Sequence, residues 1–245
     1  MKSSTSAIWE SYVASRFDAR VDRFPSEIPA DDPRLLAIRS CITDWRGKRL
    51  LDLGCGRGRY WPHWHHWGVD VTGIDISRNS LTPGCQRAFR AIGSLARLPW
   101  PDASFDVVCL LETLQHAPDP AAAMIEAGRV IVPGGTIVIV DRNPFALDPV
   151  RPWLPSLLVK WVDQRRGLWM YPPDAPVRER WHTPAFWRKT AVGLFGDWHV
   201  TYVESSEEPG RRIRRNVPLC RPFYTLAGTR SHMTLPEITA KSEPQ

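Results

Sequence analysis

Short apolar runs alternate with amphipathic stretches along most of the chain. Unbroken apolar runs of about four to eight residues are typical of strands buried on both faces of a sheet, whereas apolar residues at every third or fourth position are typical of helices. Apolar runs predict strands at residues 48–53, 69–76, 89–92, 105–111, 136–141, 198–203 and 223–228. Helical stretches separate the early strands, so the pattern predicts an α/β fold with a largely parallel sheet.

Several predicted helices begin at an acidic or hydroxyl residue followed by proline. Such a side chain caps free backbone N–H groups, and proline in the first turn needs no hydrogen-bond partner. These signals predict helices that start at Asp31 or Asp32, at Asp119 and at Thr183, the first of which is predicted to run to Gly47. Further helices are predicted over 8–24, over 61–67 and after Ser77.

The first strand runs into a glycine-rich turn, Leu-Leu-Asp-Leu-Gly-Cys-Gly-Arg-Gly-Arg-Tyr at 50–60. Glycines at 54, 56 and 58 let the backbone turn sharply and approach a ligand. A dinucleotide fingerprint, G-x-G-x-x-G, needs glycine at 59, where this chain has arginine. Asp52 suits a cationic amino group better than a pyrophosphate. The loop therefore favours S-adenosylmethionine over NAD.

The second strand ends in an acid, Asp75. It follows the glycines by roughly twenty residues, the spacing at which a βαβ unit brings a carboxylate to the ribose hydroxyls of a bound nucleotide. The glycine loop and this acid together are a much stronger signal than the loop alone.

Four motifs stand in order: Leu-Asp-Leu-Gly-Cys-Gly-Arg-Gly (51–58), Gly-Ile-Asp-Ile-Ser (73–77), Leu-Pro-Trp-Pro-Asp-Ala-Ser-Phe-Asp-Val-Val (98–108) and Arg-Val-Ile-Val-Pro-Gly-Gly (129–135). With them, residues 48–141 resemble the core of a class I S-adenosylmethionine-dependent methyltransferase of the small-molecule, type 11-like kind. The resemblance implies a Rossmann-like, doubly wound, mostly parallel seven-stranded sheet with an antiparallel last strand. It implies N-terminal helices and a helical cap inserted after the fifth strand.

The resemblance also implies site residues. Asp52 and the glycine loop would hold the methionine end of the cofactor, Asp75 the ribose and Ile76 the adenine. The implied cofactor-binding set is Asp52, Gly54, Cys55, Gly56, Gly58, Asp75, Ile76, Ser94, Leu95 and Leu111. The family commonly has an acid after the third strand that contacts the adenine amino group, but this chain has Ser94 there. Either cofactor affinity is lower or another side chain compensates.

Five segments are expected: an N-terminal helical segment covering the cofactor (1–47), the cofactor-binding core (48–141), a cap or lid (142–182), the end of the core sheet (183–230) and a disordered tail (231–245). The cap has an apolar helical stripe from Trp153 to Val162. We expect this stripe to pack as a lid rather than touch a membrane. Nearby arginines either face an anionic acceptor or pair with neighbouring acids: Arg165, Arg166, Arg178 and Arg180.

Methyl transfer needs alignment of the acceptor more than a fixed base. If a base is used, His116 is the first candidate and Glu112 the second, because both follow the fourth strand. His63, His65 and His66 share a helix without a nearby acidic or cysteine ligand, so no metal site is predicted.

Composition adds little to the choice of acceptor. The net charge of +6 permits an anionic partner, and the run Arg211–Arg215 motivates the alternative of an RNA (tRNA) methyltransferase. No apolar stretch is long enough for a membrane span, the five cysteines form no C-x-x-C pair, and a cytoplasmic protein with reduced thiols is expected.

The leading hypothesis is an enzyme that transfers a methyl group to an O, N or C nucleophile of a small, bulky or anionic metabolite. A non-catalytic S-adenosylmethionine-binding module is a third alternative, and the oligomeric state stays open.

Overall fold

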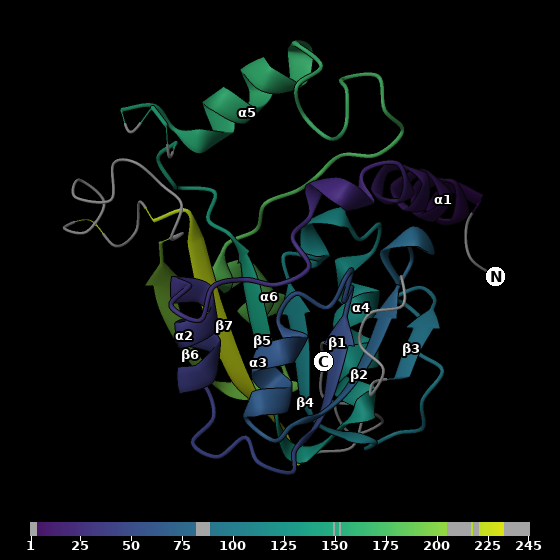
Figure 1. Ribbon diagram of the computed structural model, residues 1–245, viewed down its shortest axis with the longest axis vertical. Coiled ribbons are helices and arrows are strands. Elements are labelled where there is room, and N and C mark those ends of the chain that lie inside the picture. The colour runs from purple at the N-terminus through teal and green to yellow at the C-terminus, as the bar shows by residue number, and fades with distance from the viewer. Residues whose placement is uncertain are drawn as a thin grey trace, which may run out of the picture.

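The computed structural model describes residues 4–81, 89–148, 150–151, 153–204, 217 and 221–232. Seven strands form one sheet in the order β3-β2-β1-β4-β5-β7-β6 (Figure 1). The first five strands are parallel, and β7 runs antiparallel between β5 and β6. This confirms the predicted fold class. The strands are β1 Arg49–Leu53, β2 Asp70–Asp75, β3 Phe89–Ile92, β4 Phe105–Leu111, β5 Ile131–Arg142, β6 Phe195–Val203 and β7 Phe223–Arg230.

Helices cover both faces of the sheet. They are α1 Ser4–Asp18, α2 Pro33–Ser40, α3 Trp61–His66, α4 Pro120–Val130, α5 Ser156–Arg165 and α6 Pro184–Thr190. Because successive strand residues point to opposite faces, Leu50 packs in the cluster with α2 and α3, whereas Leu51 packs in the cluster with α4 and α6. Apolar residues on both faces explain why the strand sequences are unbroken apolar runs.

The predicted helix starts are confirmed at three helices. The side chain of Asp32 accepts a hydrogen bond from the Arg34 backbone N–H (2.8 Å), and Asp119 and Thr183 cap α4 and α6 in the same way. In each case proline occupies the first turn.

Three predicted helices differ from the structure. The helix expected over 8–24 is α1, Ser4–Asp18, which ends before a separate short 3₁₀ helix, Val21–Arg23. Helix α2 ends at Ser40 instead of Gly47, because the chain leaves the helix before Trp45, which packs in the core. The segment after Ser77 begins with a short 3₁₀ helix, Asn79–Leu81, and the rest of that prediction, 82–88, lies outside the described residues. The tail from 233 onward and the run Arg211–Arg215 also lie outside them.

Helix α1 lies across the carboxyl ends of the parallel strands, and the cap packs on it (Figure 1). Val13 of α1 forms a buried cluster with Tyr171 and Val177 of the cap. The Arg16 guanidinium of α1 donates two hydrogen bonds to the Met170 carbonyl, at 2.9 and 2.6 Å. The N-terminal segment and the cap therefore form one roof over the strand ends.

Candidate active site

The glycine loop after β1 turns where three strands come together. Gly54 has φ +76°, a conformation that side-chain-bearing residues rarely adopt, and its N–H donates to the Ile74 carbonyl of β2 at 2.7 Å. A Cβ on Gly54 would lie 2.2 Å from the side chain of Thr113, which follows β4. Only glycine fits between these neighbours. A Cβ on Gly56 would instead meet nothing within 4 Å, so this part of the loop faces open space.

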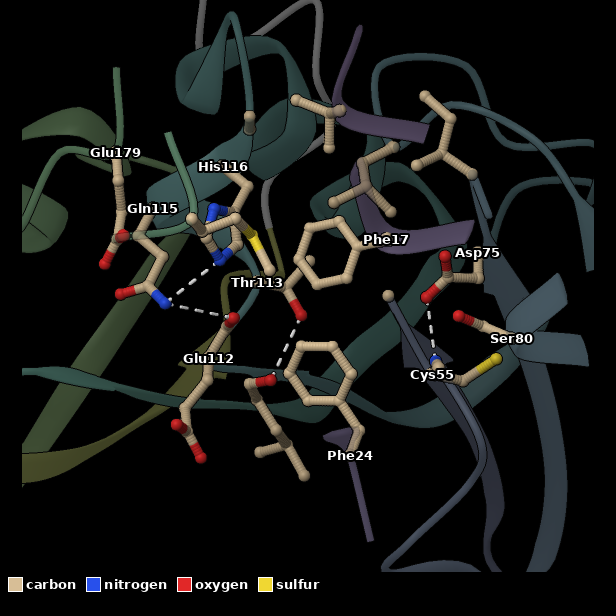
Figure 2. A pocket seen from close by; sticks show the side chains of 18 of the residues that line it. Phe17, Phe24, Cys55, Asp75, Ser80, Glu112, Thr113, Gln115, His116 and Glu179 are labelled. Carbon is tan, nitrogen blue, oxygen red and sulfur yellow. Dashed lines mark hydrogen bonds between the residues drawn. The ribbon is translucent and has the colours of Figure 1, made fainter. Parts of the chain in front are cut away.

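A cavity of about 400 Å³ lies between this loop and the roof (Figure 2). The walls come from α1, the glycine loop, the ends of β2 and β4, and the cap. The structure brings both predicted catalytic residues and most predicted cofactor residues to these walls: Gly54, Cys55, Gly56, Asp75, Ile76, Ser94, Leu95, Leu111, Glu112 and His116.

Two predicted cofactor residues, Asp52 and Gly58, are absent from the described cavity lining. Asp52 is buried, and its carboxylate accepts a hydrogen bond from the Trp61 indole N–H at 2.8 Å. Burial raises the pKa of Asp52 to about 7. A Cβ on Gly58 would lie 2.8 Å from Arg90 and 2.9 Å from Trp61, so this glycine allows the loop to pack. Both residues support the loop from behind.

Asp75 is held by backbone N–H groups at the edge of the cavity. Its Oδ2 accepts from Gly56 N–H at 2.7 Å, shown in Figure 2, and its Oδ1 accepts from Ser77 N–H at 2.8 Å. Burial raises the pKa of Asp75 above its ordinary value, and these hydrogen bonds act in the opposite direction. The carboxylate is thus oriented by the same loop that would contact a ligand.

An acid lies beside Ser94, and it comes from α1. Ser94 Oγ donates to Glu10 Oε1 at 2.6 Å, and both residues line the cavity. Because Ser94 stands where the family commonly has an acid, a compensating side chain is expected at this position. Glu10 lies where a negatively charged acceptor of hydrogen bonds was expected.

Glu112 is the centre of a chain of charges. Its Oε1 accepts from Arg34 Nη1 at 2.9 Å and from Arg59 Nη2, and Arg34 is also paired with Asp32. Glu112 has φ +56°, a left-handed backbone that is uncommon outside glycine. Although burial acts in the opposite direction, the charges of Arg59 and Arg34 lower the pKa of Glu112 to about 2. A carboxylate stabilised in this way is a weak proton acceptor at neutral pH.

His116 has the properties of a neutral base. Burial lowers its pKa below the ordinary value of 6.5. Its Nδ1 lies 3.0 Å from the Tyr171 hydroxyl and its Nε2 lies 3.2 Å from the Gln115 amide nitrogen, the contact drawn in Figure 2. The Trp9 indole N–H of α1 donates to the His116 carbonyl at 3.0 Å. Tyr171 of the cap and Gln115 therefore orient the ring, and Trp9 of α1 fixes the backbone beside it.

The cap contributes a second carboxylate, and the end of β5 contributes an arginine. Glu179 accepts from the indole N–H groups of Trp169 (2.7 Å) and Trp181 (2.5 Å), and Lys160 lies 3.7 Å away. Arg142, at the end of β5, lies against the Trp181 and Phe223 rings, with distances of 5.6 and 5.2 Å to their centroids. Among the described residues, the Arg142 guanidinium has no hydrogen-bond or ion-pair partner.

Sequence reasoning did not single out Glu10 or Arg142 as site residues, and it treated Glu179 only as a counter-charge for the cap arginines. Glu10 and Glu179 belong to no glycine loop or strand-end motif. The only available signal for Glu10 was the missing acid at position 94. Arg142 directly follows Asp141 at the predicted end of the fifth strand, the same sheet edge as Glu112, and that position could have indicated it.

Comparisons with known proteins agree with this geometry. Residues 51–139 match the family model described as "Methyltransferase domain". A ubiquinone biosynthesis O-methyltransferase of Alkalilimnicola ehrlichii is 34% identical over 121 residues, which are 45% of this chain and 49% of the relative. A 27-O-demethylrifamycin SV methyltransferase of Amycolatopsis mediterranei is 40% identical over 105 residues, 39% of each chain. The matched region thus spans about half the length of these relatives or less.

The fold agrees over a longer stretch. Phosphoethanolamine N-methyltransferase 2 of Haemonchus contortus, solved with S-adenosyl-L-methionine, superposes with a TM-score of 0.65 at 15% identity, covering 91% of this chain and 60% of that one. Residues 51–139 therefore match a methyltransferase domain, and the sheet around them has the class I methyltransferase fold. The resemblance predicted from the sequence is therefore confirmed for residues 51–139.

The described residues contain neither a membrane-spanning helix nor a metal-binding cluster. None of their helices has the length and apolar character needed to cross a bilayer. Within the same residues, no group of three or more His, Cys, Asp or Glu side chains is arranged to hold a metal ion.

Replacement of the central carboxylate tests the charge chain. We expect Glu112→Gln to lower the free energy of unfolding by about 3 kcal/mol at neutral pH, because two buried arginines lose their shared partner. The pKa of Glu112 falls on folding from about 4.5 to about 2, so its stabilisation is complete above pH 4.5 and is lost as the pH falls through that interval. The deficit of Glu112→Gln, measured by chemical denaturation, should shrink over the same interval.

The control is Asp106→Asn, which breaks an exposed pair with Arg49 and should change stability by about 1 kcal/mol or less. Equal losses in the two variants, or a Glu112→Gln deficit that does not depend on pH, would contradict the assignment.

Proposed function

We propose that the protein is a methyltransferase that moves a methyl group from S-adenosylmethionine to a small molecule bound under the cap. The observation that carries the proposal is one cavity whose walls include the glycine loop and Asp75 as well as His116 and Arg142. The bound cofactor would supply a methyl group activated by a sulfonium. The chain's residues would hold the acceptor in line, exclude water and accept a proton where the nucleophile carries one.

The residues around the loop fit this cofactor. Gly56 has open space where a side chain would project, and the Asp75 carboxylate is oriented for two hydroxyl groups. Ile76 offers an apolar wall, and the pair Glu10 and Ser94 offers hydrogen-bond acceptors for an amino group. Asp52, although buried, places negative charge behind the loop when ionised. These features support a ligand with a charged amino-acid end and a flat aromatic end that carries an amino group.

The relatives support a small acceptor. Both printed names refer to methyl transfer on small molecules, and the first names oxygen as the acceptor atom. An oxygen nucleophile is therefore the form of the proposal we favour among O, N and C. The arginine run that motivated an RNA acceptor lies outside the described residues, so no structural observation favours that alternative.

Cofactor binding is the first test. We expect the wild type to bind S-adenosylhomocysteine in calorimetry and Asp75→Asn to bind it at least about tenfold more weakly, because hydrogen bonds to a charged carboxylate are lost. The matched control is Asp70→Asn, at the opposite and exposed end of the same strand, which should bind like the wild type. No binding by the wild type would refute the proposal, and equal binding by both variants would refute the role of Asp75.

His116 is the proposed general base for a hydroxyl acceptor. Its lowered pKa keeps the ring neutral at pH 7. His116 lies in the cavity wall away from the glycine loop, on the side where the acceptor is proposed to bind. Glu112 is not proposed for this role because Arg34 and Arg59 stabilise its charged form. The sequence prediction of Glu112 as a second base therefore gains no support.

For His116→Asn we expect S-adenosylhomocysteine affinity to stay within a few-fold of wild type while turnover of a hydroxyl acceptor falls by about 10²–10⁴. The wild-type rate should fall at acidic pH only once the pH passes through the lowered pKa of His116, below 6.5, since the neutral ring is the active form. His199→Asn, an exposed histidine on β6, is the control. An unchanged rate in His116→Asn would exclude the role.

The position of Arg142 favours an acceptor that carries an anionic group. Arg142 lines the cavity together with Glu112 and Glu179. Each carboxylate already has a cationic partner other than Arg142. The neighbouring Asp141 is buried, and burial raises its pKa well above its ordinary value. An acceptor carboxylate or phosphate would therefore pair with the Arg142 guanidinium.

Arg142→Met tests this preference. With a pair of acceptors that differ only in a carboxylate and its methyl ester, the wild type should favour the anion in kcat/KM by about tenfold or more, and the variant should lose the preference. Arg188→Met, on the surface helix α6, is the control. A preference that persists in Arg142→Met would show that this arginine does not select the acceptor.

A further inference from the structure

Helix α5 carries its apolar side chains on the outside. The residues it buries are Ser156, Val159 and Lys160. The opposite face is exposed to solvent: Leu157 by 44%, Leu158 by 47% and Trp161 by 50%. Surface helices normally show the reverse arrangement. The apolar stripe of this helix was predicted to pack against the domain as a lid. Most of the stripe instead points away from the domain into solvent.

The reversal has a local cause. Lys160 Nζ donates to the Glu179 carbonyl at 2.9 Å and lies 4.5 Å from the Trp181 ring centroid. The inner face of α5 is thereby committed to holding Glu179 and its tryptophans above the cavity. The outer apolar face is not needed for packing within the described residues.

Flanking residues enlarge the exposed surface. Val150 is exposed by 70%, Trp153 by 75% and Leu168 by 71%. We call the six residues Val150, Trp153, Leu157, Leu158, Trp161 and Leu168 the cap patch. Large apolar side chains gathered on one segment of a protein surface mark an interaction site.

Positive charge accompanies the cap patch. The Arg165 guanidinium lies 3.7 Å from the Trp161 ring centroid, and Arg165 and Arg166 are both exposed with no ion-pair partner among the described residues. The acids of the same segment, Asp148 and Asp163, are paired with Arg151. The surface is thus apolar, rich in tryptophan and rimmed by unpaired arginines.

We propose that the cap patch docks on the surface of an anionic lipid bilayer. Tryptophan and leucine on one helical face enter the region between head groups and acyl chains, and adjacent arginines pair with lipid phosphates. Helix α5 lies at one end of the molecule, beyond the carboxyl ends of the parallel strands, where a planar surface can reach it (Figure 1). Leu168 belongs both to the cap patch and to the cavity wall, so docking places the cavity beside the bilayer.

Co-sedimentation with vesicles tests the proposal. The wild type should pellet with vesicles of phosphatidylcholine and phosphatidylglycerol, and much less with phosphatidylcholine alone. The double variant Leu157→Gln/Trp161→Gln should lose at least about tenfold in the partition coefficient, and Arg165→Gln/Arg166→Gln should lose the preference for anionic vesicles. Both pairs lie outside the cavity wall, so S-adenosylhomocysteine binding should be unchanged.

Val192→Gln is the control, because Val192 is an apolar residue outside the cap that is exposed at least as much as Leu157 and Trp161. Loss of pelleting in this control, or wild-type pelleting in the Leu157/Trp161 double variant, would overturn the proposal. A wild type that stays in the supernatant with both vesicle types would also overturn it. If that protein is instead a dimer that the double variant dissociates, a second copy covers the cap patch.

Discussion

The close approach of Thr113 to the backbone at Gly54 is the constraint on which the site depends. The turn at Gly54 has no room for a side chain, and its N–H is bound to β2 while Thr113 from the end of β4 lies against it. Three strand ends are therefore locked at one point. Gly56 and Asp75 lie on one side of that point, and Glu112 and His116 lie on the other. The cofactor end and the acceptor end of the cavity share one rigid floor.

The roof is built by a different means. Helix α1 and the cap contribute charged and aromatic side chains that hold one another in place. Glu179 is held by two indole N–H groups and by Lys160, and His116 is held by Tyr171 and Trp9. Below the roof, Glu112 holds two arginines in place. Arg142 lies against aromatic rings and forms no ion pair among the described residues. The floor holds the residues proposed to bind the cofactor. The roof holds the charged residues proposed to select the acceptor. Cofactor binding and acceptor choice therefore depend on different parts of the structure.

Much of the floor was predictable from the sequence because its signals are local. Glycine spacing, an acid at a strand end and proline after a capping residue each determine structure within a few positions. The roof was less predictable, because Glu10 and Glu179 reach the cavity only after distant segments pack. Helix α5 shows the limit most clearly. Periodicity identified an amphipathic helix, but it does not tell which face the domain covers, and the interactions of Lys160 decided that.

The central claim is that one cavity serves both cofactor and acceptor, and a crystal structure with S-adenosylhomocysteine tests it most directly. We predict that the ligand's ribose lies against Asp75, its amino-acid end beside the loop at Gly54–Gly56, and its sulfur directed toward the space bounded by His116 and Arg142. Electron density for the ligand outside this cavity, or a sulfur directed away from His116, would contradict the account.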